Sequence, residues 1–354
     1  MSDELSDLRI QIDAVDEELL RLFNERARLA QRVGVVKNHS VIYRPEREAV
    51  VHQRLRELNQ GPLDNQSISG IFTEVISACR ALEEVFRVAC LGPRGTYSEE
   101  ACFKHFGRQI ELHFCRSIED IFRTIQTGEA SFGVIPLENS TEGAINISLD
   151  LLFDRELYLI GEVGLPIHHN LMSKSDSRSI SKIYAHSQSL AQCHAWITQN
   201  YPGIETVPVS SNAEAAIIAS RESNAAAVAS RAAADHYELN LLATNIEDKA
   251  NNTTRFGVIA RECPRPSGRD KTSIVMASQH TAGAIFELLE PLAKNGISMT
   301  RLESRPSRMG LWEYMFFVDF EGHKDEPLVE KALNEIMVKA GFLKVLGSYP
   351  RMAN

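Results

Sequence analysis

Basic side chains interrupt an apolar helical pattern near the N-terminus. Arg26 occupies a position where the repeat over residues 5–36 calls for an apolar residue, and Lys37 follows eleven residues later. At 100° per residue, Lys37 returns to within about 20° of the face of Arg26, roughly 16 Å away, so both can converge on a small dianion. Arg9 lies about 25 Å from Arg26 on the other side and can close such a site only from a second copy. The alternative is an arginine that extends from the edge of a helix pair into solvent.

Two further polar pairs lie on the helices that follow. Cys79 and Glu83 have the i, i+4 spacing that places two side chains on one face of a predicted third helix. Arg47 and Glu48 begin a predicted second helix and can orient one another. A solvated face for Glu83 and a surface ion pair for Arg47 and Glu48 are the competing interpretations.

Three polar strings in the middle of the chain adjoin predicted strands. Residues 91–100, LGPRGTYSEE, follow a strand and open a helix, where backbone amides and hydroxyls can hold an anion. Residues 136–143, PLENSTEG, stand at the C-terminal end of a strand, where α/β sheets bind ligands. In residues 252–256, NTTRF, Thr254 offers a hydroxyl donor and Arg255 an anion clamp. Capped turns and an ordinary loop are the structural alternatives.

Two short strings near the C-terminus are candidates for ligand binding. Residues 283–285, Gly-Ala-Ile, open a predicted helix, and Gly283 permits close approach of a backbone. Residues 302–306, Leu-Glu-Ser-Arg-Pro, end a predicted strand. Structural turns are the alternative, but a small terminal unit after a linker suits ligand sensing better than catalysis.

The composition excludes several classes of protein. The 354 residues include 38 Lys and Arg against 47 Asp and Glu, a net charge of −9, so neither nucleic acid nor an anionic membrane is an expected partner. Six cysteines without a C-x-x-C pair, together with no leader sequence, predict a cytoplasmic protein. Neither a dinucleotide fingerprint nor metal-ligand spacing occurs, His168 and His169 included, so we predict no cofactor and no metal.

The elements that must position these residues fall into three regimes. Residues 5–36 predict one helix of roughly 50 Å, too long for a compact domain without a partner, so an intertwined dimer is expected. From residue 86, short strands alternate with helices, which indicates a two-lobed α/β unit with mainly parallel sheets. After a Pro- and Gly-rich linker, a βαββαβ order is typical of the ferredoxin-like fold. The predicted domains span residues 1–87, 88–265 and 271–354.

Together, these strings resemble the bifunctional chorismate mutase/prephenate dehydratase family over essentially the whole chain. GPRGTYSEEA, PLENSTEG, AHSQSLAQC, NTTRF and ESRP carry the resemblance. It implies a multidomain protein: an all-helical mutase domain that forms an intertwined dimer, a two-lobed dehydratase domain like the periplasmic binding proteins, and a ferredoxin-like ACT regulatory domain. Phenylalanine is the effector that it implies.

The resemblance also implies functional residues, one set for each domain. The mutase residues are Arg9, Arg26, Lys37, Arg47, Glu48, Cys79 and Glu83. The dehydratase residues are Thr96, Glu138, Asn139, Ser140, Gln192, Thr254, Arg255 and Phe256. The residues expected to bind phenylalanine between two subunits are Gly283, Ala284, Glu303, Ser304, Arg305 and Pro306.

The implied mutase reaction rearranges chorismate to prephenate and requires no cofactor. Arg26 and the partner's Arg9 would hold the carboxylates, and Lys37 would donate to the breaking ether oxygen. Glu48 would orient the ring hydroxyl. Glu83 would donate to the ether oxygen only in its protonated form.

The implied dehydratase reaction removes carbon dioxide and hydroxide from prephenate and yields phenylpyruvate. Thr254 would donate to the departing hydroxide and Arg255 would hold a carboxylate. A threonine hydroxyl is a weak acid, so Glu138 is expected to relay the proton.

Several positions depart from the family's pattern. Arg44 stands where some mutases have an acid, Cys79 and Glu83 replace Ser and Gln, Ala185 lacks a hydroxyl, and Gly257 replaces a bulky apolar residue. Two alternative functions stay open. One is an amino-acid-sensing binding protein, and the other is a dehydratase with a degenerate mutase domain.

Overall fold

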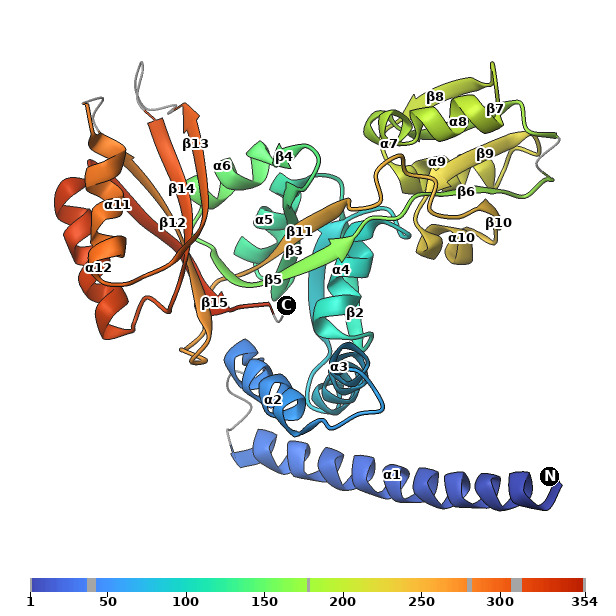
Figure 1. The fold of residues 1–354 in the computed structure, drawn as a ribbon, viewed down its shortest axis with the longest axis horizontal. Coiled ribbons are helices and arrows are strands. Elements are labelled where there is room, and N and C mark those ends of the chain that lie inside the picture. Colours follow the sequence, from blue (N-terminus) through green and yellow to red (C-terminus); the bar gives the residue numbers. More distant parts are fainter. Residues whose placement is uncertain (1, 37–42, 177–178, 279–281, 307–313, 353–354) are drawn as a thin grey trace.

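The computed structural model describes residues 2–36, 43–176, 179–278, 282–306 and 314–352. Figure 1 shows three regions in chain order: a helical N-terminal region, a central α/β region with two lobes, and a C-terminal sheet covered by helices. The predicted multidomain fold class is confirmed. Lys37 lies outside the described residues.

The N-terminal region consists of helices alone within the described residues. Its elements are α1 (Ser2–Val36), α2 (Pro45–Leu58) and α3 (Asn65–Ala81). The long helix expected from the apolar spacing is confirmed, and in Figure 1 it runs along the base of the molecule, away from the body. Several of its apolar positions, including Leu8, Val15 and Leu29, are more than half exposed in the single chain.

The first lobe of the central region is built on a sheet with the strand order β2-β1-β3-β11-β5. Its strands are β1 (Phe86–Leu91), β2 (Ile110–Cys115), β3 (Phe132–Asn139), β4 (Gly143–Ala144), β5 (Tyr158–Pro166) and β11 (Thr253–Ala260). Its helices are α4 (Tyr97–Phe106), α5 (Ile118–Gln126) and α6 (Asn146–Asp154). Helix α5 illustrates why they form: Ser117 caps its first turn, and Ile121, Phe122 and Ile125 present one apolar stripe to the core.

The second lobe has its own sheet, with the order β10-β6-β9-β7-β8. Its strands are β6 (Asn170–Ser173), β7 (Lys182–His186), β8 (Glu205–Val209), β9 (Ala225–Ala229) and β10 (Asn240–Ala243). Its helices are α7 (Ser187–Gln192), α8 (His194–Asn200), α9 (Asn212–Ala219) and α10 (Arg231–Tyr237). The chain crosses between lobes after β5 and returns in β11, as Figure 1 shows.

The prediction of mainly parallel sheets is wrong. Strand β11 returns from the second lobe and enters the first sheet between β3 and β5, antiparallel to both. In the second sheet, β6 runs antiparallel to β9 and β10. A strand that arrives from the other lobe does not follow a βα crossover within its own sheet, so the parallel rule does not govern it.

The C-terminal region confirms the predicted βαββαβ order. Its elements are β12 (Asp270–Ser278), α11 (Ala284–Lys294), β13 (Met299–Pro306), β14 (Tyr314–Glu321), α12 (Pro327–Lys339) and β15 (Phe342–Pro350), with the sheet order β13-β14-β12-β15. One face of this sheet packs against α11 and α12. The other face contacts the first lobe, where Phe317 and Tyr349 share a core with Leu152 and Leu159.

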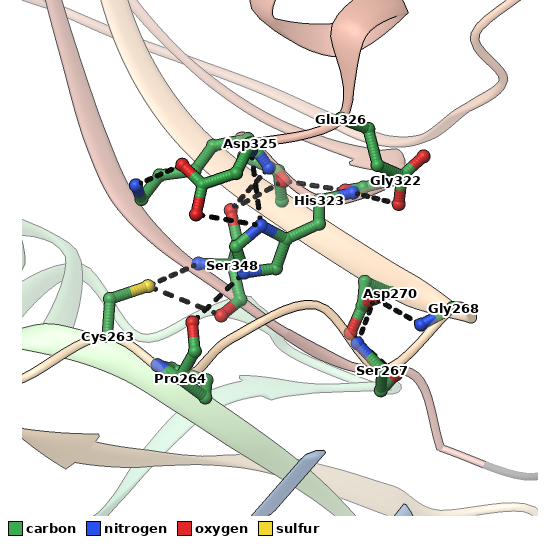
Figure 2. Close-up of polar contacts among 12 residues, drawn as sticks. Cys263, Pro264, Ser267, Gly268, Asp270, Gly322, His323, Asp325, Glu326 and Ser348 are labelled. Atoms are coloured by element: carbon green, nitrogen blue, oxygen red, sulfur yellow. Dashed lines mark hydrogen bonds and ion pairs between the residues drawn. The ribbon is translucent and has the colours of Figure 1, made fainter. Parts of the chain in front are cut away.

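The linker before β12 is fastened to the C-terminal sheet. Figure 2 shows His323, which is fully buried, between the linker and the turn after β14. Its Nδ1 accepts from the backbone N–H of Asp325 at 3.2 Å, so its Nε2 donates to the carbonyl of Pro264 at 3.1 Å. The Cys263 thiol donates to the carbonyl of Ser348 at 3.4 Å. These bonds hold the linker against the sheet.

None of the helices in the described ranges is both long and apolar enough to cross a membrane.

Candidate active site

A cavity of about 730 Å³ lies between the two lobes of the central region. The first lobe contributes Thr96, Tyr97, Asn139, Asn252, Thr254 and Phe256 to its lining. The second lobe contributes Gln188, Ser189, Gln192, Ser211 and Asn212, and His169 comes from the segment that joins the lobes. A volume of this size suits a small-molecule ligand. Of the sequence-predicted dehydratase residues, the cavity brings together Thr96, Asn139, Gln192, Thr254 and Phe256.

Asn139 and Thr254 lie side by side at the ends of neighbouring strands. They are partners in the register of β3 and β11, and both are buried. The Asn139 Nδ2 donates to the Thr254 Oγ1 at 2.9 Å. The Thr254 hydroxyl therefore accepts this bond, and among the described residues no acceptor bonds its own proton. That proton is available to a ligand in the cavity.

The predicted roles of Arg255 and Glu138 in substrate contact do not fit the structure. Successive side chains of a strand point to opposite faces of the sheet. Because Thr254 and Phe256 line the cavity, Arg255 points to the other face, where its Nη1 lies 2.7 Å from Asp319 Oδ2. Glu138 likewise points away from the cavity, and its Oε2 lies 2.8 Å from Arg301 Nε.

These two residues belong to an ion network that joins the first lobe to the C-terminal sheet. Its members are Glu138, Glu162, Arg255, Lys271, Arg301 and Asp319, three acids and three bases. Burial opposes ionisation of Asp319, but the attraction of Arg255 and a hydrogen bond from Ser273 hold the pKa of this carboxyl below its usual value. The network is therefore a charged, buried contact between two domains.

Replacing Asp319 by asparagine is expected to lower the free energy of unfolding by about 3 kcal/mol, because it removes the nearest carboxylate from Arg255 and leaves two acids against three bases in the network. Chemical denaturation of the full chain measures this loss. Asp325→Asn is the matched control: Asp325 is half exposed and pairs with Lys324, so its loss should cost about 1 kcal/mol or less. Equal stability of the two variants would contradict the assignment.

Ser140 and Thr96 have mainly structural contacts. Ser140 lies outside the cavity lining, and its Oγ accepts from the backbone N–H of Thr253 at 2.9 Å, which fastens the start of β11. Thr96 caps α4: its hydroxyl accepts from the N–H of Glu99 and donates to the carbonyl of Leu91. Thr96 still lines the cavity, but its hydroxyl is occupied within the protein.

The cavity offers groups that favour an anion. Arg116 supplies a guanidinium to the described lining and is itself exposed. The first residues of α4 and α9 also line the cavity, and the N-terminus of a helix carries unpaired N–H groups that attract negative charge. Sequence reasoning missed Arg116, which carries no motif. It follows directly after β2, which is parallel to β1, and the C-terminal end of a parallel strand is a typical ligand-binding position. That position is the signal that could have identified it.

In the helical region, Glu48 forms an ion pair with a residue that sequence reasoning missed. Arg80 Nη1 lies 2.7 Å from Glu48 Oε1, and Arg80 Nη2 donates to the carbonyl of Phe106 at 2.6 Å. Arg80 is buried and also stacks over Phe86. Burial raises the pKa of Glu48, although Arg80 and Arg26 oppose this shift. The signal that could have identified Arg80 is an arginine on the buried face of a helix.

The other mutase candidates are only partly assembled in the single chain. Helix α3 ends at Ala81, and Glu83 lies in the turn that follows it, while Cys79 is buried within the helix. Glu83 contacts α1, where its carboxylate fills the space that a Cβ at Gly34 would occupy. Arg26 is half-buried, and its charge acts on Glu48. Arg9 and Arg47 are exposed.

The candidate effector residues lie at one edge of the C-terminal sheet. Gly283 adopts a φ of 84° and caps α11, which begins at Ala284. Strand β13 is an edge strand, and its alternation turns Ser304 and Pro306 to one face and Arg305 to the other. Arg305 pairs with Asp150 of α6 at 2.6 Å, so a direct contact of Arg305 with an effector does not fit the structure. Glu303 shares the face of Arg305 and lies 3.7 Å from Arg301.

Two departures from the family's pattern have a packing explanation. At Gly257, a Cβ would lie 2.6 Å from Leu159 Cδ2 and 2.8 Å from Leu137 Cδ1, so these leucines occupy the volume of a larger side chain. Ala185 is fully buried in the second-lobe core, where a hydroxyl would need a partner. Nothing in the structure explains Arg44, whose buried Nε has no partner among the described residues.

Comparison with protein families divides the chain into three matches. Residues 8–84 match the family described as chorismate mutase type II, and residues 88–264 match prephenate dehydratase. Residues 272–336 match the ACT domain.

Individual proteins are similar over most or all of the chain. A bifunctional chorismate mutase/prephenate dehydratase of Pseudomonas aeruginosa is 47% identical over an alignment of 360 positions, which covers 99% of this chain and 98% of the relative. One of Escherichia coli K12 is 34% identical over 97% of this chain and 95% of the relative. The crystal structure of a prephenate dehydratase in complex with L-Phe from Arthrobacter aurescens matches with a TM-score of 0.69 and 31% identity, over 75% of this chain and 90% of that chain. The chain thus belongs to the bifunctional chorismate mutase/prephenate dehydratase family.

Proposed function

We propose that this chain catalyses two consecutive reactions, chorismate to prephenate in the helical domain and prephenate to phenylpyruvate in the central domain. The observation that carries the second reaction is the Thr254 hydroxyl, which accepts from Asn139 and holds its proton free at the wall of the cavity between the two lobes. The near full-length relatives with both activities in their names support the pairing of the two reactions. We assign residues 1–87, 88–265 and 271–354 to the mutase, dehydratase and ACT domains.

In the dehydratase reaction, prephenate loses its ring carboxylate as carbon dioxide and its ring hydroxyl as hydroxide, and the ring becomes aromatic. Thr254 donates a hydrogen bond to the departing oxygen. The role of holding a substrate carboxylate is assigned to Arg116 rather than to Arg255, because Arg116 lines the cavity and Arg255 does not. Gln192 and Phe256 complete the wall around the ring.

In the mutase reaction, the site must hold the dianion in a compact conformation and stabilise negative charge on the breaking ether oxygen. Glu48 reaches the ring hydroxyl from α2, held there by Arg80. Arg26 binds one carboxylate, and Lys37 is assigned the ether oxygen by resemblance. The exposed apolar stripe of α1 is covered by a second copy of the chain, which brings the partner's Arg9 to the site.

Glu83 is expected to make the mutase activity sensitive to pH. An ionised carboxylate beside the ether oxygen repels the developing negative charge, whereas the protonated form donates to it. Mutase activity should therefore decline toward alkaline pH, and Glu83→Gln should remove this decline. Initial rates of chorismate consumption across the pH range measure the effect. An unchanged alkaline limb in Glu83→Gln would refute this role.

Phenylalanine is the proposed effector, bound between the ACT domains of two subunits near Gly283, Ala284, Ser304 and Pro306. The edge position of β13 supports this site, because an edge strand leaves backbone groups free for a partner subunit. Binding lowers the dehydratase activity. Calorimetric titration of the full-length protein with phenylalanine, followed by dehydratase assays at the same concentrations, tests the proposal; no heat and no inhibition would refute it.

A coupled assay distinguishes the proposed function from its alternatives. Purified full-length protein is given chorismate, and prephenate and phenylpyruvate are followed together. Formation of both supports the proposal. Phenylpyruvate from added prephenate but not from chorismate would indicate a degenerate mutase domain, and binding of phenylalanine without either product would indicate a sensor.

The six free cysteines support a cytoplasmic location.

A further inference from the structure

His169 is a buried imidazole in the cavity wall that the proposed chemistry does not use. It lies between β5 and β6, and only 2% of its surface is exposed. Its Nδ1 is 3.0 Å from the Tyr97 hydroxyl of the first lobe, and its Nε2 is 2.9 Å from the Gln192 Oε1 of the second lobe. The ring therefore connects the two walls of the cavity.

One backbone amide sets the direction of the hydrogen bonds in this wall. The N–H of Thr141 donates to the Asn139 Oδ1 at 3.0 Å, and a backbone N–H can only donate. The Asn139 Nδ2 must therefore face Thr254 and Asn252, to which it donates at 2.9 and 2.8 Å. Because the Asn252 Oδ1 accepts this bond, the Asn252 Nδ2 donates to the Gln192 Oε1 at 3.1 Å.

Gln192 then fixes the tautomer of His169. The Gln192 Nε2 lies 3.2 Å from both Thr141 Oγ1 and Glu142 Oε1 and donates to them. The Gln192 Oε1 faces His169, and an amide oxygen only accepts, so the His169 Nε2 must carry a hydrogen. A neutral His169 then has a bare Nδ1, which accepts from the Tyr97 hydroxyl.

The Tyr97 hydroxyl has a second acceptor, the carbonyl of His168 at 2.9 Å. If His169 takes up a proton at Nδ1, this N–H donates to the Tyr97 oxygen, and the Tyr97 hydrogen turns to the His168 carbonyl. The bond from Nε2 to Gln192 persists in both protonation states. Burial lowers the pKa of His169, which favours the neutral ring.

We propose that His169 is a positioning residue of the dehydratase site. Its Nε2–H holds the Gln192 amide, and through Asn252 and Asn139 this contact keeps the Thr254 hydroxyl proton directed at the cavity. His169 does not itself transfer a proton to the substrate, because both ring nitrogens are bonded within the protein. The inference rests on the proposed dehydratase function.

Two amide substitutions test the hydrogen bonds of the two His169 ring nitrogens separately. Glutamine places its amide nitrogen near the position of Nε2, whereas asparagine places it near Nδ1. We expect His169→Gln to keep kcat for prephenate within a few-fold of the unmodified protein. His169→Asn should lower kcat about tenfold or more, the scale of one lost hydrogen bond in a buried chain, with KM changed only a few-fold. Steady-state assays of phenylpyruvate formation measure both constants.

Three controls accompany the test. His236→Asn makes the same substitution at an exposed histidine of α10 and should leave both constants unchanged. Mutase activity and the thermal midpoint of each variant report on folding. A double-mutant cycle tests the connection: in a Gln192→Ala background, His169→Asn should have no further effect on kcat.

Equal losses in His169→Gln and His169→Asn, or full activity in both, would overturn the inference, as would additive effects in the cycle. A lower kcat in His169→Gln alone would also overturn it, because it would show that the bond between Nδ1 and Tyr97 matters instead. Absence of phenylpyruvate from the unmodified protein would overturn the proposed function, and this inference with it. That outcome is distinct, because it does not depend on any variant.

Discussion

Replacing Thr254 by alanine is expected to lower the rate of phenylpyruvate formation by a factor of about 100 or more, because one preorganised hydrogen-bond donor to the developing negative charge contributes about 10²- to 10³-fold. The hydroxyl oxygen accepts from Asn139, so its hydrogen is directed to the cavity and to the departing oxygen of prephenate. Alanine removes the donor and leaves the Asn139 amide with one partner fewer. Thr254→Ser keeps the hydroxyl and should retain most of the rate.

The matched control is Thr253→Ala, one residue earlier on β11. Thr253 is exposed, and its bonds to Ser140 use backbone atoms, so its side chain is dispensable. Prephenate formation from chorismate should stay within a few-fold in every variant, since the helical domain lies at the other end of α4. Joint loss of both activities would indicate misfolding, and full dehydratase activity in Thr254→Ala would disprove the assignment.

The placement of Thr254 and Arg255 shows which parts of the site the sequence can predict. Adjacent residues of a strand cannot both face one cavity, so the alternation alone requires a choice between them. The sequence does not contain the answer, because it depends on which face of β11 the second lobe covers. The same reasoning separates Asn139, which lines the cavity, from Glu138, which does not.

Elements with a strong local pattern were predictable, and contacts between distant segments were not. The apolar spacing of α1 and the βαββαβ order of the C-terminal domain are local properties of the chain. The antiparallel entry of β11 depends on a segment that leaves the first lobe and returns to it. Arg80 and His169 carry no motif either, and their importance follows from partners 32 and 23 residues away.

The length of α1 determines how the mutase site can be completed. Seventeen residues separate Arg9 from Arg26, which is about 25 Å along one helix. Two arginine side chains cannot close that distance around one small ligand, so one chain cannot bring both guanidinium groups to one chorismate. In the proposed dimer, an antiparallel second copy packed on the exposed apolar stripe of α1 would reverse the order of the residues and bring the partner's Arg9 near Arg26.

Arg9→Ala and Arg26→Ala are therefore each expected to abolish mutase activity. A mixture of the two singly substituted chains is expected to recover part of it. In a heterodimer of the two variants, one site has both arginines and the other has neither. Random assortment makes half of the dimers heterodimers, each with one intact site of two, so an equal mixture that is unfolded and refolded together should recover about a quarter of the unmodified activity. Chorismate consumption by the mixture, compared with each variant refolded alone, measures the recovery. If both arginines served a site within one chain, every site of the heterodimer would lack one of them and the mixture would stay inactive. Dehydratase activity, which uses neither residue, should remain normal in all three samples and reports that the chains have refolded.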